Sequence, residues 1–472
     1  MPERPPYTGP DLCALTATEA VVLLHRGEVS PAELVEASLS RMAQVEPAVN
    51  AMVTPCPDRA RAAAMRAESD SLLAGLPLGI KDLTPVAGVR TTWGTKALAD
   101  HVPEASAPLV TRIEARGGIV MGKTNTPEQG AGGNTFNAVF GATRNPWDTS
   151  RNAGGSSGGA AVSLATGEVW LSHGSDHAGS LRTPANYCGV VGLRPSPGVA
   201  GGPAQVAFAP YSVQGPMARN VADCALFLDV MAGFDPVWPL SWPAPETPYA
   251  QACRQAPGPL RIGFSADLGG FAPVTSEIAQ VLTTALGQVT DATTAVEAAT
   301  PDLTGLDQTF RTLRGLLFTA EAQATPDEVR RHYKPAYQQN IREGQALTAE
   351  DIGAAMLAQS RLYAEMLRFF QKFDVLACAV NGLPPGPVEE EFPTEVAGQP
   401  MRDYIDWLRF AFLATTCGLP ALSLPVGFTA EGLPVGLQLI GPPRGEARLL
   451  QIARHIEESL GLPSTPIDPV RR

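Results

Sequence analysis

The chain has 472 residues, of which 44% are hydrophobic and 17% charged, a balance that permits a large core and excludes a mainly disordered state. Its formal net charge is −12 and no basic run exceeds two residues, so we expect neither nucleic acid nor an anionic membrane surface as a partner. Seven cysteines are scattered without a Cys-x-x-Cys pair, and the first residues lack the order of a signal peptide. We therefore expect a cytoplasmic protein with free thiols, and the lack of an apolar run of about 18 residues predicts no membrane span.

Two helix starts are evident in the first 70 residues. Thr16 with Glu19, and Ser30 with Glu33, have the spacing of capping boxes, in which the hydroxyl and the carboxylate satisfy backbone N–H groups reciprocally. Pro31 suits the first position of the second helix. Residues 1–70 are thus predicted to form a helical layer with no chemistry of its own.

From about residue 75, short apolar runs alternate with helical stretches, which predicts an α/β fold with helices on both faces of a sheet. Apolar spacing over residues 446–460 also predicts an amphipathic helix, and a hairpin is expected around 429–432. The expected strands are 75–82, 118–121, 169–171, 260–264, 373–380, 421–426 and 435–440.

We expect residues 1–472 to form a single domain without internal repeats. Its catalytic core would be residues 75–225, and its C-terminal strands and helix residues 411–472. The variable region between them, 234–410, begins with a proline-rich stretch at 234–259 and includes a helical insertion near 302–370.

Two glycine-rich segments carry serines that are candidates for chemistry, residues 151–161 and 174–184. Glycine lets backbone N–H groups approach a ligand closely, and a serine after such groups is typical of a nucleophile beside an oxyanion hole. Lys81 closes a buried strand upstream of both segments. Glycine turns are common on their own, but two such segments together with this lysine favour a catalytic site.

These segments resemble the amidase signature family of serine hydrolases. The resemblance extends from about residue 16 to 460, and it implies a three-layer α/β/α fold with a large mixed central sheet. The motifs that carry it are Asn145-Pro146-Trp147, Arg151, residues 154–159, Gly174-Ser175-Asp176, Gly179-Ser180-x-Arg182-x-Pro184-Ala185, residues 189–195, residues 215–219 and residues 418–425.

The resemblance implies a Ser–cis-Ser–Lys triad. Lys81 would be the base, Ser156 the bridging serine after a cis peptide bond, and Ser180 the nucleophile. A lysine accepts a proton only when neutral, and at a pKa near 10.4 roughly one in 2,500 is neutral at pH 7. Burial must therefore lower the pKa of Lys81. Asp82 is expected to face away, because neighbours on a strand point to opposite faces.

The resemblance also assigns an oxyanion hole and supporting residues. The oxyanion would be held by the backbone N–H groups of His177, Ala178, Gly179 and Ser180. Ser157, Asp176 and Arg182 are the supporting residues, and Gly130, Gly132, Trp147 and His177 are candidates for the substrate pocket.

One departure from the family pattern lies just before the nucleophile. The family usually has Asp-Thr-Gly-Gly-Ser, whereas this chain has Asp176-His177-Ala178-Gly179-Ser180. The branch that contains the nylon cyclic-dimer hydrolases looks similar in replacing Thr-Gly here. We expect a negative φ at Ala178. The imidazole of His177 is expected to hydrogen-bond nearby backbone as a spectator.

Three other patterns carry less weight. Residues 117–124 fit the letters of a P-loop, but their apolar, β-prone middle does not suit an open phosphate cradle. Residues 155–159 fit a nucleophile elbow, which requires a suitably placed downstream histidine. His173 and His177 share no helix that would direct both at a metal. We expect no metal and no cofactor.

The predicted function is hydrolysis of the C–N bond of a small-molecule carboxamide through an acyl-enzyme on Ser180. The amidase subunit of a tRNA-dependent amidotransferase is the alternative, and the change at 177–178 weighs against it. A catalytically silent binding relative is a third reading, which the intact Lys81, Ser156 and Ser180 disfavour. The oligomeric state stays open, a homodimer included.

Overall fold

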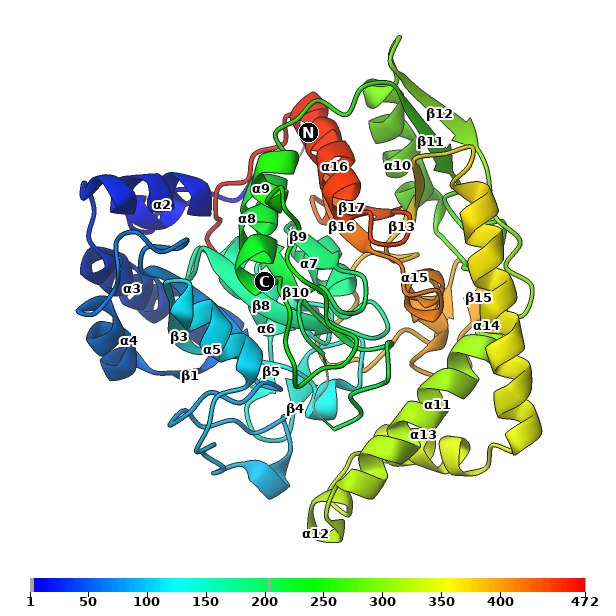
Figure 1. The fold of residues 1–472 in the computed structure, drawn as a ribbon, viewed down its shortest axis with the longest axis horizontal. Coiled ribbons are helices and arrows are strands. Elements are labelled where there is room, and N and C mark those ends of the chain that lie inside the picture. The colour runs from blue at the N-terminus through cyan, green and yellow to red at the C-terminus, as the bar shows by residue number, and fades with distance from the viewer. Residues whose placement is uncertain (1–3, 203–204, 472) are drawn as a thin grey trace.

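The computed structural model describes residues 4–202 and 205–471, and within them the chain is organised around one eleven-stranded mixed sheet (Figure 1). The strand order is β1-β3-β2-β8-β10-β9-β16-β17-β13-β11-β12. β2 is parallel to β3 and β8, whereas β10 is antiparallel to β8 and β9. The expected α/β fold with a large mixed sheet is confirmed. The strands are β1 Met52–Pro55, β2 Leu76–Lys81, β3 Gly118–Thr124, β8 Leu171–Asp176, β9 Val191–Arg194, β10 Val213–Ala218, β11 Leu260–Phe264, β12 Thr294–Ala298, β13 Val375–Ala379, β16 Ala421–Phe428 and β17 Pro434–Ile440.

Helices cover both faces of this sheet. Along β3 the side chains alternate, so that Ile119 and Met121 join a core cluster with α3, α4 and α6, while Val120 joins the cluster that contains α5 and α8. The longer helices are α2 Ala17–Arg26, α3 Pro31–Val49, α4 Pro57–Ala64, α5 Pro108–Ala115, α6 Gly158–Ala165, α7 Arg182–Cys188, α8 Val221–Met231, α10 Ser276–Val289, α11 Leu306–Ala324, α13 Pro335–Gln345, α14 Ala349–Phe369 and α16 Glu446–Leu460. The shorter ones are α1 Asp11–Ala14, α9 Tyr249–Ala252, α12 Asp327–Arg330, α15 Phe412–Thr416, η1 Lys96–Leu98, η2 Glu128–Gly130 and η3 Asp406–Ala411.

In the part of the chain that the structure describes, three small ribbons lie outside the main sheet. They pair β4 Phe136–Asn137 with β5 Gly141–Ala142, β6 Arg144–Asn145 with β7 Asp148–Asn152, and β14 Glu395–Val396 with β15 Gln399–Pro400.

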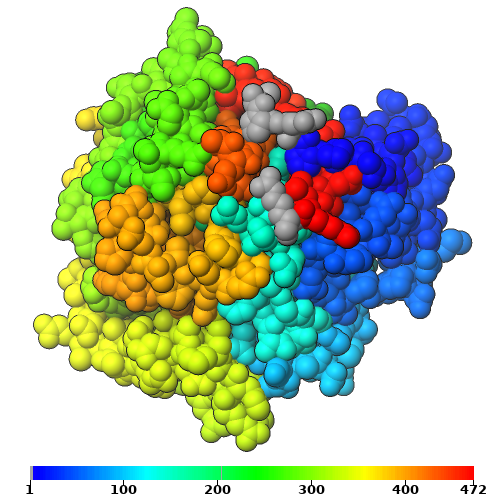
Figure 2. Space-filling model, turned by 180° about the vertical axis from the view of Figure 1, so that it is seen from behind, coloured from blue at the N-terminus to red at the C-terminus, as the bar shows by residue number. Residues whose placement is uncertain are grey.

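The N-terminal helices begin where the sequence predicts. Both capping boxes form, with Thr16 and Glu19 at α2 and with Ser30 and Glu33 at α3. Sequence reasoning missed the edge strand β1 in this region. Figure 2 shows the first described residues, in dark blue, beside the last described residues, in red, and the Asp468 N–H donates to the Pro6 carbonyl at 2.7 Å. Ile467 in the same C-terminal tail accepts a hydrogen bond from Arg41 of α3 and donates its N–H to Ala165 of α6, so the tail links the helical layer to the catalytic core.

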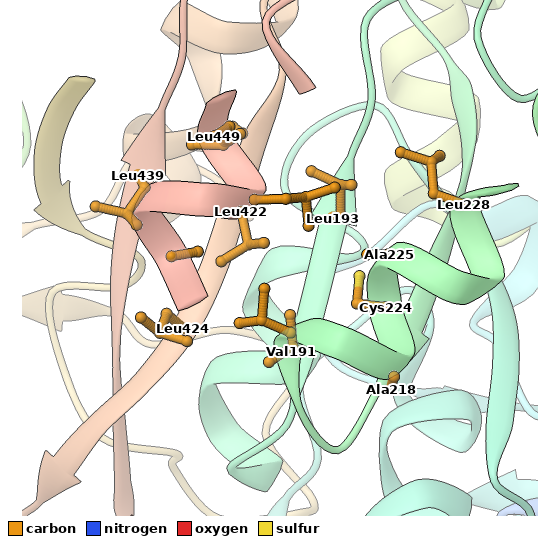
Figure 3. Packing of buried hydrophobic residues seen from close by; sticks show 14 of the residues in the cluster. Val191, Leu193, Ala218, Cys224, Ala225, Leu228, Leu422, Leu424, Leu439 and Leu449 are labelled. Carbon is orange, nitrogen blue, oxygen red and sulfur yellow. The ribbon is translucent and has the colours of Figure 1, made fainter. Parts of the chain in front are cut away.

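The centre of the sheet is packed by aliphatic side chains from several elements (Figure 3). Val191 and Leu193 of β9 lie near Leu422 of β16, and Leu449 of α16 packs in the same cluster. All four are fully buried. This core fixes the strands whose ends carry the polar residues described below.

The expected strand at 169–171 is wrong in its position. β8 begins at Leu171 and continues to Asp176, through polar and glycine residues that do not read as a buried strand. It lies in the sheet interior between β2 and β10, whose backbone groups satisfy its own. Tertiary pairing therefore overrides local propensity here.

The insertion expected near 302–370 is helical. α11, α13 and α14 extend along one side of the molecule (Figure 1), and α11 packs on both other helices and on α15. The proline-rich stretch 234–259 is mostly irregular and contains only α9. Within the described residues, no helix is both long and apolar enough to span a membrane.

Truncation of the core should destabilise the fold strongly. Leu439 of β17 is fully buried, so Leu439→Ala should lower the free energy of unfolding by about 2–5 kcal/mol through lost transfer energy and a residual cavity. Leu357→Ala on α14, where the side chain is 76% exposed, is the matched control and should change it by less than about 0.5 kcal/mol. Urea unfolding curves measure both, and equal shifts would contradict this assignment of the core.

Candidate active site

Lys81 ends β2 and its side chain is completely buried. Its Nζ donates to three hydroxyl oxygens, those of Ser156 at 2.7 Å, Ser157 at 2.8 Å and Ser175 at 3.0 Å. Burial lowers the pKa of Lys81 to about 7, although the charge of Asp176 acts in the opposite direction. A substantial fraction of this amine is therefore neutral near neutral pH.

Ser175 was not singled out from the sequence. It stands in the Gly174-Ser175-Asp176 motif, but only the pairing of β8 beside β2 brings its hydroxyl to Lys81. No local pattern provides a signal for Ser175, because Ile80 is in register with His173, and strand alternation alone therefore does not direct the Ser175 side chain toward Lys81.

Asp82 faces away from Lys81, as expected for its neighbour. Its carboxylate accepts hydrogen bonds from the backbone and hydroxyl of Thr92 and lies 3.4 Å from Nζ of Lys123. Lys123 belongs to the P-loop-like pattern, but residues 118–124 form the strand β3, and Nζ also donates to the Thr84 carbonyl. The second buried lysine thus has its own carboxylate partner, unlike Lys81.

Ser156 and Ser157 lie between a cis peptide bond and a helix. The Gly155–Ser156 bond is cis, and Ser157 is the N-cap residue of α6. The Ser157 N–H donates to the Ser180 carbonyl at 3.1 Å, which joins the two glycine-rich segments. Gly130 lies close by with a φ of +71°, and a Cβ there would come within 3.5 Å of Ser156 Oγ. Gly130 therefore borders the site.

The turn from β8 to α7 carries Ser180, and Asp176 holds it in place. The Asp176 carboxylate accepts from the backbone N–H groups of Gly179 and Leu181, each at 3.1 Å. It also pairs with Arg182 at 2.8 Å and Arg194 at 3.3 Å. Burial alone would raise the pKa of Asp176, but these charges and hydrogen bonds hold it well below its ordinary value. Asp176 and Arg182 thus lie where they can support the turn of residues 177–180, which contains the expected nucleophile and is called the nucleophile turn below.

The amides of the nucleophile turn differ in their availability. The Gly179 N–H is engaged with Asp176, whereas those of His177, Ala178 and Ser180 donate to no protein acceptor among the described residues. The φ of Ala178 is not positive, as expected, and Gly179 takes the left-handed value of +90°. Three of the four expected oxyanion donors are therefore free to bind an oxygen atom.

Ser180 is largely buried, with 8% of the residue exposed. Its hydroxyl forms no hydrogen bond with any residue that the structure describes, including Ser156. The contact from Lys81 to Ser156 is formed, and the contact from Ser156 to Ser180 is not formed as a hydrogen bond here.

The prediction for His177 is wrong in its partner. Its Nδ1 is 3.1 Å from the hydroxyl of Ser212, not from backbone, and its ring lies 5.8 Å from that of Phe310 and 6.0 Å from that of Phe318. Burial, followed by the charges of Arg314 and Arg194, lowers the pKa of His177 to about 3. The imidazole is therefore neutral, and it forms part of a mainly aromatic wall with α11.

Gly132 lies beside Lys334, whereas Trp147 lies beside the C-terminal end of α7. A Cβ on Gly132 would come within 3.4 Å of Lys334 Nζ, so this glycine faces the helical insertion. Trp147 clusters with Leu433 and Ile467, and its indole N–H donates to the Cys188 carbonyl at the C-terminal end of α7. Ser180 precedes the opposite end of that helix, so these contacts give Trp147 a packing role.

Comparison with known families matches residues 33–450 to the family described as Amidase. The chain belongs to this amidase family, and it is an enzyme that hydrolyses carbon–nitrogen bonds in amides. It is 35% identical to an acylamidase of Rhodococcus erythropolis over 94% of this chain and 95% of that protein. It is also 35% identical to a subunit of the glutamyl-tRNA(Gln) amidotransferase of Moorella thermoacetica, over 95% of this chain and 97% of that one.

Solved structures agree with this assignment. A bacterial aryl acylamidase of the amidase signature family superposes with a TM-score of 0.89 at 28% identity, covering 95% of this chain and 97% of that one. A 6-aminohexanoate cyclic dimer hydrolase complexed with substrate gives a TM-score of 0.87 at 28% identity, covering 96% and 98%. The resemblance to the signature family and to its nylon-hydrolase branch is confirmed.

Removing the charge of Asp176 should destabilise the protein. Asp176→Asn would leave the buried Arg182 and Arg194 without their carboxylate, a loss of about 3–5 kcal/mol. The matched control is Asp374→Asn, because Asp374 and its partner Arg448 are both only half-buried, and it should cost less than about 1 kcal/mol. Urea unfolding at neutral pH measures both, and equal losses would contradict the role of Asp176.

The same carboxylate should make stability depend on acid. Its folded pKa lies below the unfolded value of about 3.9, so its contribution is complete above that pH and is lost as pH falls toward the folded value. Acid unfolding followed by circular dichroism should therefore be shallower in Asp176→Asn than in the natural protein. Parallel acid curves would show that Asp176 is not the ionised partner.

Proposed function

We propose that the enzyme cleaves a carboxamide through an acyl-enzyme on Ser180, with Ser156 and Lys81 as the proton relay. The observation that carries this proposal is the contact of 2.7 Å between a fully buried Lys81 and Ser156. A buried amine that is partly neutral near pH 7 suits a general base. Ser180 lies in the turn that follows β8, and its carbonyl accepts a hydrogen bond from the Ser157 N–H. This position supports Ser180 as the nucleophile.

The proposed reaction has two halves. Ser180 Oγ attacks the amide carbon while its proton moves to Ser156 Oγ, and the proton of Ser156 moves to Lys81 Nζ. The free backbone N–H groups of the nucleophile turn stabilise the oxyanion. Collapse breaks the C–N bond, and the departing amine takes a proton from Ser156, which Lys81 replaces. Water then attacks the acyl group by the same relay, and the carboxylic acid leaves.

The amidase subunit of a tRNA-dependent amidotransferase is a second candidate, because subunits of glutamyl-tRNA(Gln) amidotransferases are also 35% identical over nearly the whole chain. The two candidates differ in whether the chain works alone. Ammonia or amine release by the purified chain supports the hydrolase, whereas release that requires a second subunit supports the amidotransferase.

We place this reaction in the cytoplasm. All seven cysteines are free thiols, and six of them are buried, which suits a reducing compartment. The substrate is a small-molecule amide.

Lys81→Arg should abolish most activity while it keeps the positive charge. A guanidinium does not release its proton in proteins, so it cannot act as the base. Loss of a general base typically lowers the rate by about 10²–10⁴-fold, and we expect kcat/KM to fall by that order. In the natural enzyme kcat/KM should rise about tenfold per pH unit below pH 7 and level off above it, as Lys81 becomes neutral. A flat profile with an active Lys81→Arg would contradict the relay.

Labelling identifies the nucleophile independently of the substrate. A fluorophosphonate probe should label the natural protein but not Ser180→Ala, because only an activated serine reacts. Ser360→Ala on the exposed face of α14 is the control and should label normally. Intact-protein mass spectrometry reports the adduct, and persistent labelling of Ser180→Ala would place the nucleophile elsewhere.

A further inference from the structure

A buried arginine stands on the helical insertion behind His177. Arg314 of α11 is 5% exposed, and its Nη1 donates to Asn340 Oδ1 of α13 at 2.9 Å. Its Nη2 donates to the hydroxyl of Tyr404, which itself donates to the same Asn340 oxygen. Arg314, Asn340 and Tyr404, called the Arg314 cluster below, come from three separate segments.

The charge of Arg314 has no ionised partner. Among the described residues, no carboxylate forms a salt bridge or hydrogen bond with this guanidinium, whose two polar partners are neutral. A guanidinium keeps its proton, and burying an ion is costly unless it is paired. Its position over the ring of Phe318, 4.0 Å from the centroid, offsets only part of that cost.

The neighbouring acids do not fill this role. Asp406 and Asp403 interact with Arg311, one turn earlier on α11. Glu321 lies two turns further on, and among the described residues its carboxylate forms no salt bridge or hydrogen bond with Arg314, while desolvation raises its pKa and so disfavours its charged form. The guanidinium of Arg314 therefore remains available for an external anion.

The Arg314 cluster lies one aromatic ring from the nucleophile turn. Phe318 stacks under Arg314, and the same ring is 6.0 Å from the imidazole of His177. Two buried nitrogen atoms here have no partner among the described residues, Nε of Arg314 and Nε2 of His177. Such atoms are costly to leave unsatisfied, which indicates that a ligand completes them.

We propose that the Arg314 cluster binds a carboxylate of the substrate, so that the amide cleaved at Ser180 belongs to an anionic molecule. The planar guanidinium matches a carboxylate in geometry and charge, and the Tyr404 hydroxyl lies beside it as a further polar contact. The aromatic wall of Phe310 and Phe318 would accommodate the apolar stem between this carboxylate and the amide. The inference rests on the proposed function, because the anionic substrate would be cleaved at Ser180. The preference for an anion would come from Arg314.

Binding to an inactive enzyme tests this inference without catalysis. Isothermal titration of Ser180→Ala should use two ligand pairs, each comparing a carboxylate with its neutral amide isostere. One pair is the monoamide of an α,ω-dicarboxylic acid against its diamide, in several chain lengths, and the other is an N-acyl amino acid against its amide. A charged hydrogen-bond partner predicts roughly 10- to 100-fold tighter binding of the carboxylate in one pair. The pair that responds shows whether the anion lies on the acyl or the amine side.

The variants separate recognition from folding. Arg314→Gln in the Ser180→Ala background should remove that preference and leave binding of the neutral ligand within about twofold, whereas Arg314→Lys should keep part of it. Arg361→Gln on α14, which removes the same charge from an exposed surface pair, should change neither. If Arg314→Gln does not fold, the comparison of charged and neutral ligands in Ser180→Ala decides alone.

Failure of the carboxylate site and failure of the proposed reaction give different results. Equal binding of carboxylate and neutral ligands in both pairs, or a preference that persists in Arg314→Gln, would overturn the carboxylate site. A preference that depends on Arg314, in a protein that hydrolyses no amide, would support the site and contradict the proposed reaction.

Discussion

The site depends on the complete burial of the Lys81 amine among hydroxyl groups. The amine contacts Ser156, Ser157 and Ser175, and its desolvation is the main cause of a pKa near 7. Lys123, in the neighbouring strand β3, shows what happens when a carboxylate is supplied, because Asp82 lies beside its ammonium and its pKa is lowered only to about 8. The two buried lysines thus differ in their partners, which are hydroxyl groups for Lys81 and a carboxylate for Lys123.

The buried carboxylate of Asp176 orders the rest of the site through several hydrogen bonds and ion pairs. Asp176 organises the nucleophile turn through two backbone N–H groups and two arginines, and Arg182 continues the network to Gln438 of β17. The turn is thus joined to the packed centre of the sheet. The helical insertion contributes the rings of Phe310 and Phe318, which lie beside His177.

Much of this was accessible from the sequence, and what was missed depends on tertiary contacts. Capping residues predict α2 and α3, apolar runs predict six of the eleven strands of the main sheet, and the signature motifs predict the pair of Lys81 and Ser156, which are in contact. The strands β1, β9, β10 and β12 were not predicted. The strand β8 was misplaced because its glycines and polar residues are stabilised by neighbouring strands, not by their own propensity. Ser175 and Arg314 could not be assigned, since nothing local shows which hydroxyl reaches Lys81 or that an arginine on a distant helix is buried without an acid.

Direct titration of Lys81 by NMR measures whether its amine is neutral near pH 7. Lysine side chains labelled with ¹³C at Cε can be followed by NMR across pH, with the Lys81 resonance assigned by its loss in Lys81→Met. We expect a midpoint near 7 for the Lys81 resonance, well below that of the surface lysines. A Lys81 midpoint near the ordinary value of about 10.4 would contradict it, because the amine would then be charged and unable to accept the proton of Ser156.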